Sequence, residues 1–202
     1  MKNNLNNLKS NPKILGLDVS TKTVGVALFD IETKELLELT HVSPVPKPKV
    51  DNKIKELILK SEIFRTKLLQ YKDLGITKVI IEEPLLNSNN IYTIQTLLRY
   101  NTLITKEIYD VLGIVPDYIS TYNSRKNAFP HLVQPNNKGK YVLFGSYPKD
   151  CDKKQIIWEL VAKREPQITW SYTKNNTLKK ENFDQTDAYC CVLGYMKQED
   201  IW

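Results

Sequence analysis

Residues 13–30 read KILGLDVSTKTVGVALFD, two short apolar stretches separated by a polar link. Residues 13–19 and 23–30 have the length and the β-branched content of buried strands, and residues 20–22 join them. After a turn-like segment, residues 36–42 have the pattern of a third strand. Because links this short can join only antiparallel neighbours, we predict that the chain begins with an antiparallel meander.

Helix and strand signals alternate along the rest of the chain. A proline-rich connector follows the meander, and Asp51 then has the position of a helix N-cap. The segment 91–112 has apolar residues at helical spacing, with Asn89 or Asn90 as its cap and Gly113 directly after its end. We predict helices at residues 51–72, 91–112, 153–164 and 184–197, and further strands at residues 77–81 and 114–120.

This order of elements predicts an α/β fold, a five-stranded mixed sheet flanked by helices. A right-handed crossover would put the fourth strand beside the first. Residues 13–202 are expected to form a single domain, since that length is ordinary for one domain. Residues 1–12 are rich in Asn and Lys and are expected to form a flexible tail. Residues 129–152 have no strong period and are expected to form an irregular excursion.

Composition bears on the partner and the compartment. The chain has 29 Lys and Arg residues against 23 Asp and Glu residues, a net charge of +6, which favours a polyanionic partner. Three cysteines, with Cys190 and Cys191 adjacent, cannot build a disulfide framework and suit a reducing compartment. The sequence contains no run of about 18 apolar residues, so it predicts no membrane-spanning helix. Residues 1–13 lack the apolar segment of a secretory signal. We therefore expect a cytoplasmic protein that does not enter membranes.

Four acidic residues fall at the ends of predicted elements that this topology brings together. Asp18 interrupts an apolar strand, Glu82 closes another, and Asp184 and Asp187 share one face at the start of the last helix. A carboxylate at the end of an apolar strand is costly unless something pairs with it. Oxygen ligands select a hard ion, so we predict that the four acids bind two Mg²⁺ or Mn²⁺ ions. Two such ions are suited to phosphodiester hydrolysis.

Each acid also has a purely structural interpretation, which the sequence leaves open. Asp18 could form a turn with Ser20, and Glu82 could pair with a lysine of a neighbouring helix. Asp184 is a natural N-cap, and Asp187 would suit the dipole in the first turn of the same helix. With only two histidines and no suitable spacing, the sequence does not predict a zinc site.

The three segments that carry these acids resemble the acidic motifs of the RuvC family of Holliday junction resolvases. They are ILGLDVSTKTVGVALFD, VIIEEPLL and FDQTDAYCCVLGY, and they match in order and in spacing. The resemblance implies the RNase H-like fold and gives the four acids the roles of metal ligands and catalytic residues. The sequence departs from bacterial members at Leu85, where they carry an aromatic residue that stacks at the junction core. Residues 129–152 are also longer than the equivalent segment in the family.

Basic and aromatic residues, some near the same sheet edge and some in the excursion at residues 129–152, are candidates for DNA contacts. The predicted phosphate ligands are Lys22, Arg125, Lys126, Lys138 and Lys140. The aromatic residues that could stack on unpaired bases are Tyr122, Phe129, Tyr141 and Tyr147. The alternative is that most of these are solvated lysines and aromatic residues of the core.

The resemblance implies a Mg²⁺-dependent, structure-selective DNA endonuclease that resolves four-way junctions as a homodimer, with Mn²⁺ as a substitute ion. We expect residues 91–112 to form the dimer interface, although a core helix of a monomer would have the same period. The alternatives are an RNase H-like nuclease that acts on RNA or an RNA–DNA hybrid, a non-catalytic binder of branched DNA, and an actin-like phosphotransferase. The last needs two domains and glycine-rich loops, which 202 residues with seven glycines disfavour. Richness in Asn and Lys is typical of proteins from low-GC genomes, and a bacteriophage genome is one candidate source. A phage-encoded protein would act in the host cytoplasm.

Overall fold

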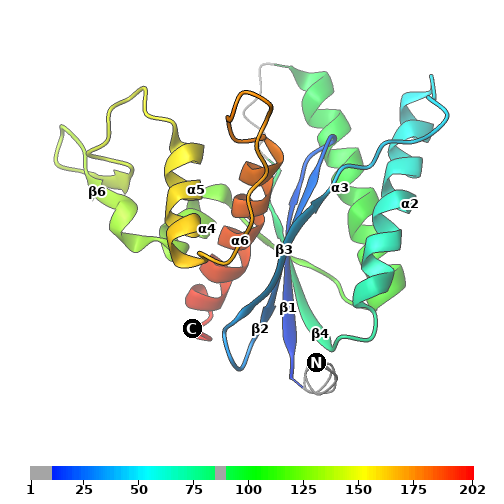
Figure 1. The fold of residues 1–202 in the computed structure, drawn as a ribbon, viewed down its shortest axis with the longest axis horizontal. Helices are drawn as coiled ribbons and strands as arrows, with labels where there is room; N and C mark the ends of the chain where they lie inside the picture. Colours follow the sequence, from blue (N-terminus) through cyan, green and yellow to red (C-terminus); the bar gives the residue numbers. More distant parts are fainter. Residues whose placement is uncertain (1–10, 85–89) are drawn as a thin grey trace.

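The structure, a computed structural model, describes residues 11–84 and 90–202. At its centre is a five-stranded sheet with the strand order β3-β2-β1-β4-β5 (Figure 1). The strands are β1 (Lys13–Val19), β2 (Val24–Asp30), β3 (Leu36–Val42), β4 (Ile76–Glu82) and β5 (Asp117–Ile119). β2 pairs antiparallel with β1 and β3, whereas β4 pairs parallel with β1 and β5. The predicted mixed sheet and its opening meander are confirmed, with the fourth strand beside the first.

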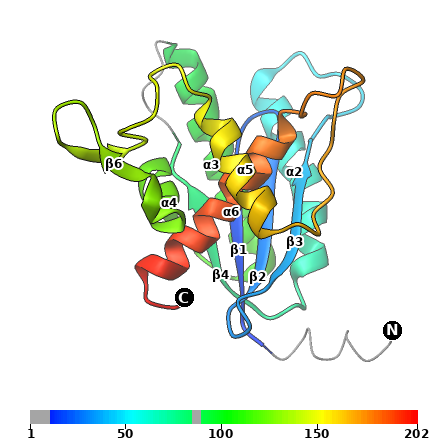
Figure 2. The same cartoon turned by 60° about the vertical axis from the view of Figure 1, so that its left-hand side comes forward.

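Helices cover both faces of this sheet (Figures 1 and 2). One face is covered by α2 (Lys53–Tyr71) and α3 (Ile91–Leu112), the other by α4 (Thr121–Ala128), α5 (Lys153–Arg164) and α6 (Glu181–Gln198). The side chains of β1 alternate between the two layers. Leu15 and Leu17 join the core under α2 and α3, while Ile14 joins the core under α6. Each layer therefore has its own buried apolar core.

The helix caps agree with the sequence prediction at α3 and differ at α2. Asn52, rather than Asp51, caps α2, because its side-chain oxygen accepts a hydrogen bond from the backbone N–H of Lys55. Asn90 caps α3, and Gly113 ends it in the left-handed conformation that glycine adopts without strain. β5 has three residues and is shorter than the predicted strand at residues 114–120.

The segment after β5 holds more regular structure than its sequence pattern indicates. α4 follows at once, with the Ser120 side chain accepting a hydrogen bond from the backbone N–H of Asn123. A 3₁₀ turn (Pro130–Leu132) then leads into a small hairpin of β6 (Val133–Pro135) and β7 (Tyr141–Leu143). Sequence patterns miss α4 because its eight residues have weak helix propensity, and its helical form depends on packing against α6.

Some expectations fall outside the described residues. The predicted tail, residues 1–12, lies there except for Asn11 and Pro12, and so do Leu85 and the alternative cap Asn89. Among the described helices, none has both the length and the apolar composition needed to cross a bilayer.

Candidate active site

The ends of β1 and β4 bring two carboxylates side by side. Leu17 of β1 is in register with Ile81 of the parallel strand β4, so Asp18 and Glu82 follow one residue later on neighbouring strands. Leu17 and Ile81 belong to the core under α2 and α3. Because side chains alternate along a strand, Asp18 and Glu82 face the opposite layer, which contains α6.

Two glycines allow α6 to lie directly on the strands. Gly25 is in register with Asp18, and a Cβ atom at Gly25 would lie 2.0 Å from the backbone oxygen of Asp184. A Cβ atom at Gly16 would lie 2.6 Å from the backbone oxygen of Ala188. Any side chain at either position would push the helix away from the sheet. The absence of side chains therefore lets the acids of α6 reach those of the strands.

The carboxylates of Asp18, Glu82 and Asp187 form a compact group, with one oxygen from each lying within 4.8 Å of the others. They line a cleft of about 190 Å³ to which the ends of β1 and β4 and the helices α4, α5 and α6 contribute. Asp187 is buried, and Asp18 and Glu82 are half-buried. Asp184 lines the same cleft but stands outside the group of three.

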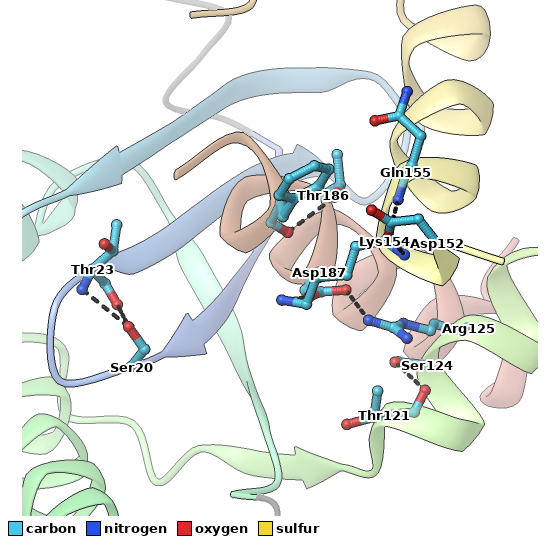
Figure 3. A network of polar contacts seen from close by, with 11 residues as sticks. Ser20, Thr23, Thr121, Ser124, Arg125, Asp152, Lys154, Gln155, Thr186 and Asp187 are labelled. Carbon is cyan, nitrogen blue, oxygen red and sulfur yellow. Dashed lines mark hydrogen bonds and ion pairs between the residues drawn. The ribbon is translucent and has the colours of Figure 1, made fainter. Parts of the chain in front are cut away.

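Two cations hold the Asp187 carboxylate in place. Arg125 from α4 donates a hydrogen bond to its Oδ1 at 2.7 Å, and the Lys154 ammonium from α5 lies 3.1 Å from its Oδ2. Figure 3 shows Arg125 reaching Asp187 from its neighbouring helix, with Lys154 beside it. Five acidic side chains, Glu83 included, thus line the cleft with two cations, and an excess of negative charge remains.

Burial, together with this excess charge, raises the pKa of three of the carboxyl groups. Burial first, and then the Glu82 and Asp187 carboxylates, hold the pKa of Asp18 well above its ordinary value. Burial and the Asp187 carboxylate also raise the pKa of Glu82. For Asp184, burial raises the pKa to about 6, with Lys154 acting in the opposite direction. Like charges in a poorly solvated cleft disfavour each other's ionisation, and a bound cation would remove that penalty.

The donor set fits a hard divalent cation. Every candidate ligand is a carboxylate oxygen, and Glu82 Oε1 is buried without a hydrogen-bond partner among the described residues. A buried carboxylate oxygen without a partner is destabilising, and a metal ion would satisfy it. Asp18, Glu82 and Asp187 would hold the ion, and Asp184 is the nearby candidate ligand for a second. Oxygen ligands of this kind select Mg²⁺ or Mn²⁺.

The two predicted DNA-binding residues of α4 lie in different surroundings. The guanidinium of Arg125 is in the cleft, and its side chain is only 11% exposed. Lys126 is exposed, and its ammonium lies 5.8 Å from the centroid of the Tyr122 ring. Arg125 therefore belongs to the carboxylate site, whereas Lys126 and Tyr122 are available on the outer surface of α4.

The other predicted DNA contacts lie outside the cleft. Lys22 is exposed between β1 and β2 and lines a separate groove. Lys138 and Lys140 lie in the turn between β6 and β7, followed by the exposed Tyr141. Phe129 is buried in the core, which excludes stacking on bases and agrees with the alternative that it is an aromatic residue of the core. Tyr147 is half-buried and packs against the same core.

Two features of the cleft were not predicted from sequence. Lys154 occupies the first turn of α5, where the helix dipole disfavours a cation, and this mismatch was the only local signal of a nearby carboxylate. α6 begins at Glu181, so the predicted start of this helix at residue 184 is wrong, and the alternative interpretation of Asp184 as its N-cap is excluded. The additional turn is tied down by Asn182, whose side chain exchanges two hydrogen bonds with the backbone of Ser171.

Neither a protein-family model nor a curated protein sequence matches the chain. Solved structures match it along most of its length. RuvC from Thermus thermophilus aligns with a TM-score of 0.56 over 93% of this chain and 95% of its own, at 13% identity. The same protein in complex with a Holliday junction substrate gives a TM-score of 0.59 over 92% and 95%, at 10% identity. The yeast mitochondrial Holliday junction resolvase Ydc2 gives 0.58 over 93% of this chain and 79% of its own, at 11% identity.

Sequence identities this low establish the fold and no more. The three alignments extend over nearly the whole described chain, including the sheet and the helical layers on both of its faces. The chain therefore has the RNase H-like fold that it shares with RuvC and Ydc2.

Proposed function

We propose that this protein is a metal-dependent endonuclease for branched DNA, and that its substrate is the four-way junction. The observation that carries the proposal is the group of Asp18, Glu82 and Asp187 oxygens within 4.8 Å of one another at the carboxyl ends of β1 and β4. The fold, shared with two resolvases, supports the same assignment. The net charge of +6 suits a polyanionic substrate.

The residues of the cleft have distinct roles in this proposal. Asp18, Glu82 and Asp187 would ligate Mg²⁺, with Asp184 contributing to a second ion and Mn²⁺ as a substitute. When bound, the ions supply an activated water and stabilise the leaving oxygen of the phosphodiester. Arg125 and Lys154 fix the orientation of the Asp187 carboxylate and reduce the negative charge of the cleft, so that a phosphate group can approach.

A non-catalytic DNA binder would have no use for this arrangement. Acids that face incoming phosphates weaken DNA binding, and burying them together raises the pKa of Asp18 and Glu82. Both costs are offset only if the acids bind metal. An RNase H-like enzyme acting on RNA or on an RNA–DNA hybrid would use the same acids, so the substrate test below includes both.

We further propose that the outer face of α3 forms a homodimer interface. Ile91, Leu98 and Tyr109 are exposed at spacings of seven and eleven residues, which place them on one stripe of the helix. Exposed apolar stripes on helices mark protein contacts. A two-fold dimer would present two clefts to a substrate that itself has two-fold symmetry.

The test is cleavage of labelled four-way junction, fork, flap, duplex, RNA and RNA–DNA hybrid, with Mg²⁺, with Mn²⁺ and with chelator. We expect metal-dependent cleavage of the junction above all other substrates. Asp18→Asn and Glu82→Gln should abolish it and leave junction binding intact or tighter. Glu83→Gln is the matched control, since the exposed Glu83 lines the cleft but is not in the carboxylate group. Near-normal turnover by Asp18→Asn, or preferential cleavage of a hybrid, would reject the assignment.

A further inference from the structure

We propose that the β6–β7 hairpin and the first turn of α5 form a second DNA-binding surface, which holds the phosphate backbone of a duplex arm outside the active-site cleft. This inference rests on the proposed function, because it assumes a branched DNA substrate. It assigns a role to residues 129–152, a segment that the carboxylate site does not use.

The hairpin is an ordered element that presents its lysines in fixed positions. Its base is anchored by the buried side chains of Leu132 and Phe144, and the Phe144 backbone N–H donates to the Leu132 oxygen at 2.7 Å. At its turn, the Asn136 side-chain oxygen accepts hydrogen bonds from the backbone N–H groups of Lys138 and Lys140. The loop conformation is therefore determined by the chain itself, and the two lysine side chains extend from it, exposed.

The groove beside the hairpin is lined by charges of one sign. Residues 129–149 contain three lysines and no Asp or Glu, and Asp150 and the α5 cap Asp152 follow outside the groove lining. A groove of about 390 Å³ beside the hairpin is lined by Lys138, Lys149 and Lys153, and none of its lining residues is acidic. Within the described ranges, these three lysines and Lys140 form no ion pair with a carboxylate, unlike Lys154 in the cleft. Unpaired cations around a groove favour an anionic occupant.

The hairpin surface is continuous with the carboxylate cleft through α5. Lys153 and Lys154 are neighbours in the first turn of that helix. The Lys154 ammonium lies 3.1 Å from Asp187, whereas the Lys153 ammonium lies 5.8 Å from the centroid of the Phe144 ring at the base of the hairpin. Figures 1 and 2 show the hairpin projecting from the body of the protein beyond α4, on the same side of the sheet as α5 and α6. A DNA arm that leaves the cleft past α5 would meet these lysines.

Phosphate groups are the chemistry that this surface recognises. Lysine ammonium groups act as point charges and contact the DNA backbone without reading sequence. Each phosphate that is neutralised releases counterions, which makes binding dependent on salt concentration. The hairpin should therefore strengthen binding of every substrate whose arm reaches it and leave the chemical step in the cleft unchanged.

The experiment compares two triple variants with equal loss of charge. The first variant carries Lys138→Ala, Lys140→Ala and Lys149→Ala. The second variant, the control, carries alanine at three exposed lysines that line neither the carboxylate cleft nor the groove beside the hairpin: Lys55, Lys72 and Lys163. Junction affinity is measured without metal over a range of salt concentrations. We expect the hairpin variant to lose roughly tenfold or more in affinity and about 2.7 units in the slope of log K against log salt, both relative to the control. A triple Lys→Arg variant should restore both values, which separates loss of charge from misfolding.

Equal affinities and equal slopes for the two alanine variants would overturn the inference. Cleavage at saturating protein distinguishes this result from failure of the proposed function. We expect the hairpin variant to cleave the bound junction at the wild-type rate, since its carboxylates are intact. If the wild-type protein binds junctions through the hairpin but cleaves nothing in Mg²⁺, the proposed function fails and the DNA-binding surface stands.

Discussion

The two faces of the sheet are built differently. On one face, α2 and α3 rest on large side chains such as Leu15, Leu17 and Val26, and α3 leaves a stripe of apolar residues exposed. On the other face, α6 lies over Gly16 and Gly25 and is buried along most of its length, because α4 and α5 cover it. Among the residues that the structure describes, only this second face brings carboxylates from the sheet and from a helix into one group.

The comparison shows how the distance between helix and sheet determines what a face can do. Large side chains keep a helix away from the strands, and the space between them is an apolar core. Glycines let the backbone of α6 touch the strands, so that short aspartate side chains on both can converge. The ion pairs of the two faces also differ in kind. On the α3 side, the half-exposed Arg65 pairs with Glu107 and Asp110. On the other side, Asp187 is paired inside a cluster of further acids.

The largest expected effect is that of Asp187→Asn, compared with Glu107→Gln on the opposite face. Mutating a residue that only hydrogen-bonds to a metal ligand already lowers metal affinity or activity by about 10- to 100-fold. Loss of the ligand itself should therefore lower the cleavage rate by more than about a hundredfold, in Mg²⁺ and in Mn²⁺. Glu107→Gln removes an equally buried, ion-paired carboxylate and should lower only the melting temperature. Single-turnover cleavage and thermal melting of both variants test this. Equal activities would mean that Asp187 is a structural ion-pair partner like Glu107.

Gly25→Ala should break the close contact between α6 and the sheet. The new Cβ atom would collide with the Asp184 backbone at 2.0 Å, and overpacking of this kind costs about 3 kcal/mol. Cleavage should fall with stability, because the helix carries two of the acids. Gly113→Ala is the control, since its left-handed backbone is strained by a side chain, at about 1 kcal/mol, but no atom lies within 4 Å. If the Gly25→Ala protein is as stable as the control, α6 can move away from the sheet without lowering the free energy of unfolding.

Asp184→Asn should have a smaller effect than Asp187→Asn, of about tenfold in Mg²⁺, with partial recovery in Mn²⁺, which accepts an amide ligand more readily. Its melting temperature should hold or rise, because the variant removes a carboxyl whose pKa burial has raised to about 6. Glu181→Gln, the other acid in the first turn of α6, is the control and should leave cleavage unchanged. Full activity of Asp184→Asn in Mg²⁺ would show that Asp184 is not needed as a ligand and that the site consists of three acids.

Metal should stabilise the folded protein more at high pH than at low pH. Burial raises the pKa of Asp184 from 3.8 to about 6, and that of Asp18 is raised as well, so between these values the folded state binds more protons than the unfolded state. The stability of the metal-free protein therefore falls as pH rises through this window. Mg²⁺ relieves the repulsion, and the rise in melting temperature that it causes should be several degrees larger at about pH 8 than at about pH 5. An equal rise in Asp18→Asn would show that the ion binds elsewhere.

The smallest effect on stability is expected on the outer face of α3. Leu98→Lys with Tyr109→Lys should convert a dimer into a monomer and change the unfolding free energy of the protomer by less than about 0.5 kcal/mol, since both side chains are exposed. Sedimentation analysis measures the mass. Tyr172→Lys, at an exposed tyrosine in the segment before α6, is the control and should leave the mass unchanged. A wild-type monomer would contradict the proposed interface.

The sequence by itself determined the sheet and the candidate acids. Alternating and continuous apolar runs specify β1 to β4, because a buried strand must be apolar wherever it meets a core. Asn90 and Gly113 mark both ends of α3 for a local reason, the hydrogen bonding of exposed backbone groups. Asp18 and Glu82 stand out because an ionisable residue in an apolar strand needs a partner from elsewhere in the chain.

Only the tertiary structure decided what surrounds those acids. The helical form of α4 and the early start of α6 depend on packing and on the Asn182–Ser171 hydrogen bonds, which have no local periodicity. The pairing of Asp187 with Arg125 and Lys154 joins residues far apart in the chain, and any of 29 basic residues could have taken those places. A local sequence pattern can identify a residue that needs a partner. Which residue becomes the partner depends on how the helices pack on the sheet, and here two glycines allow α6 to pack closely.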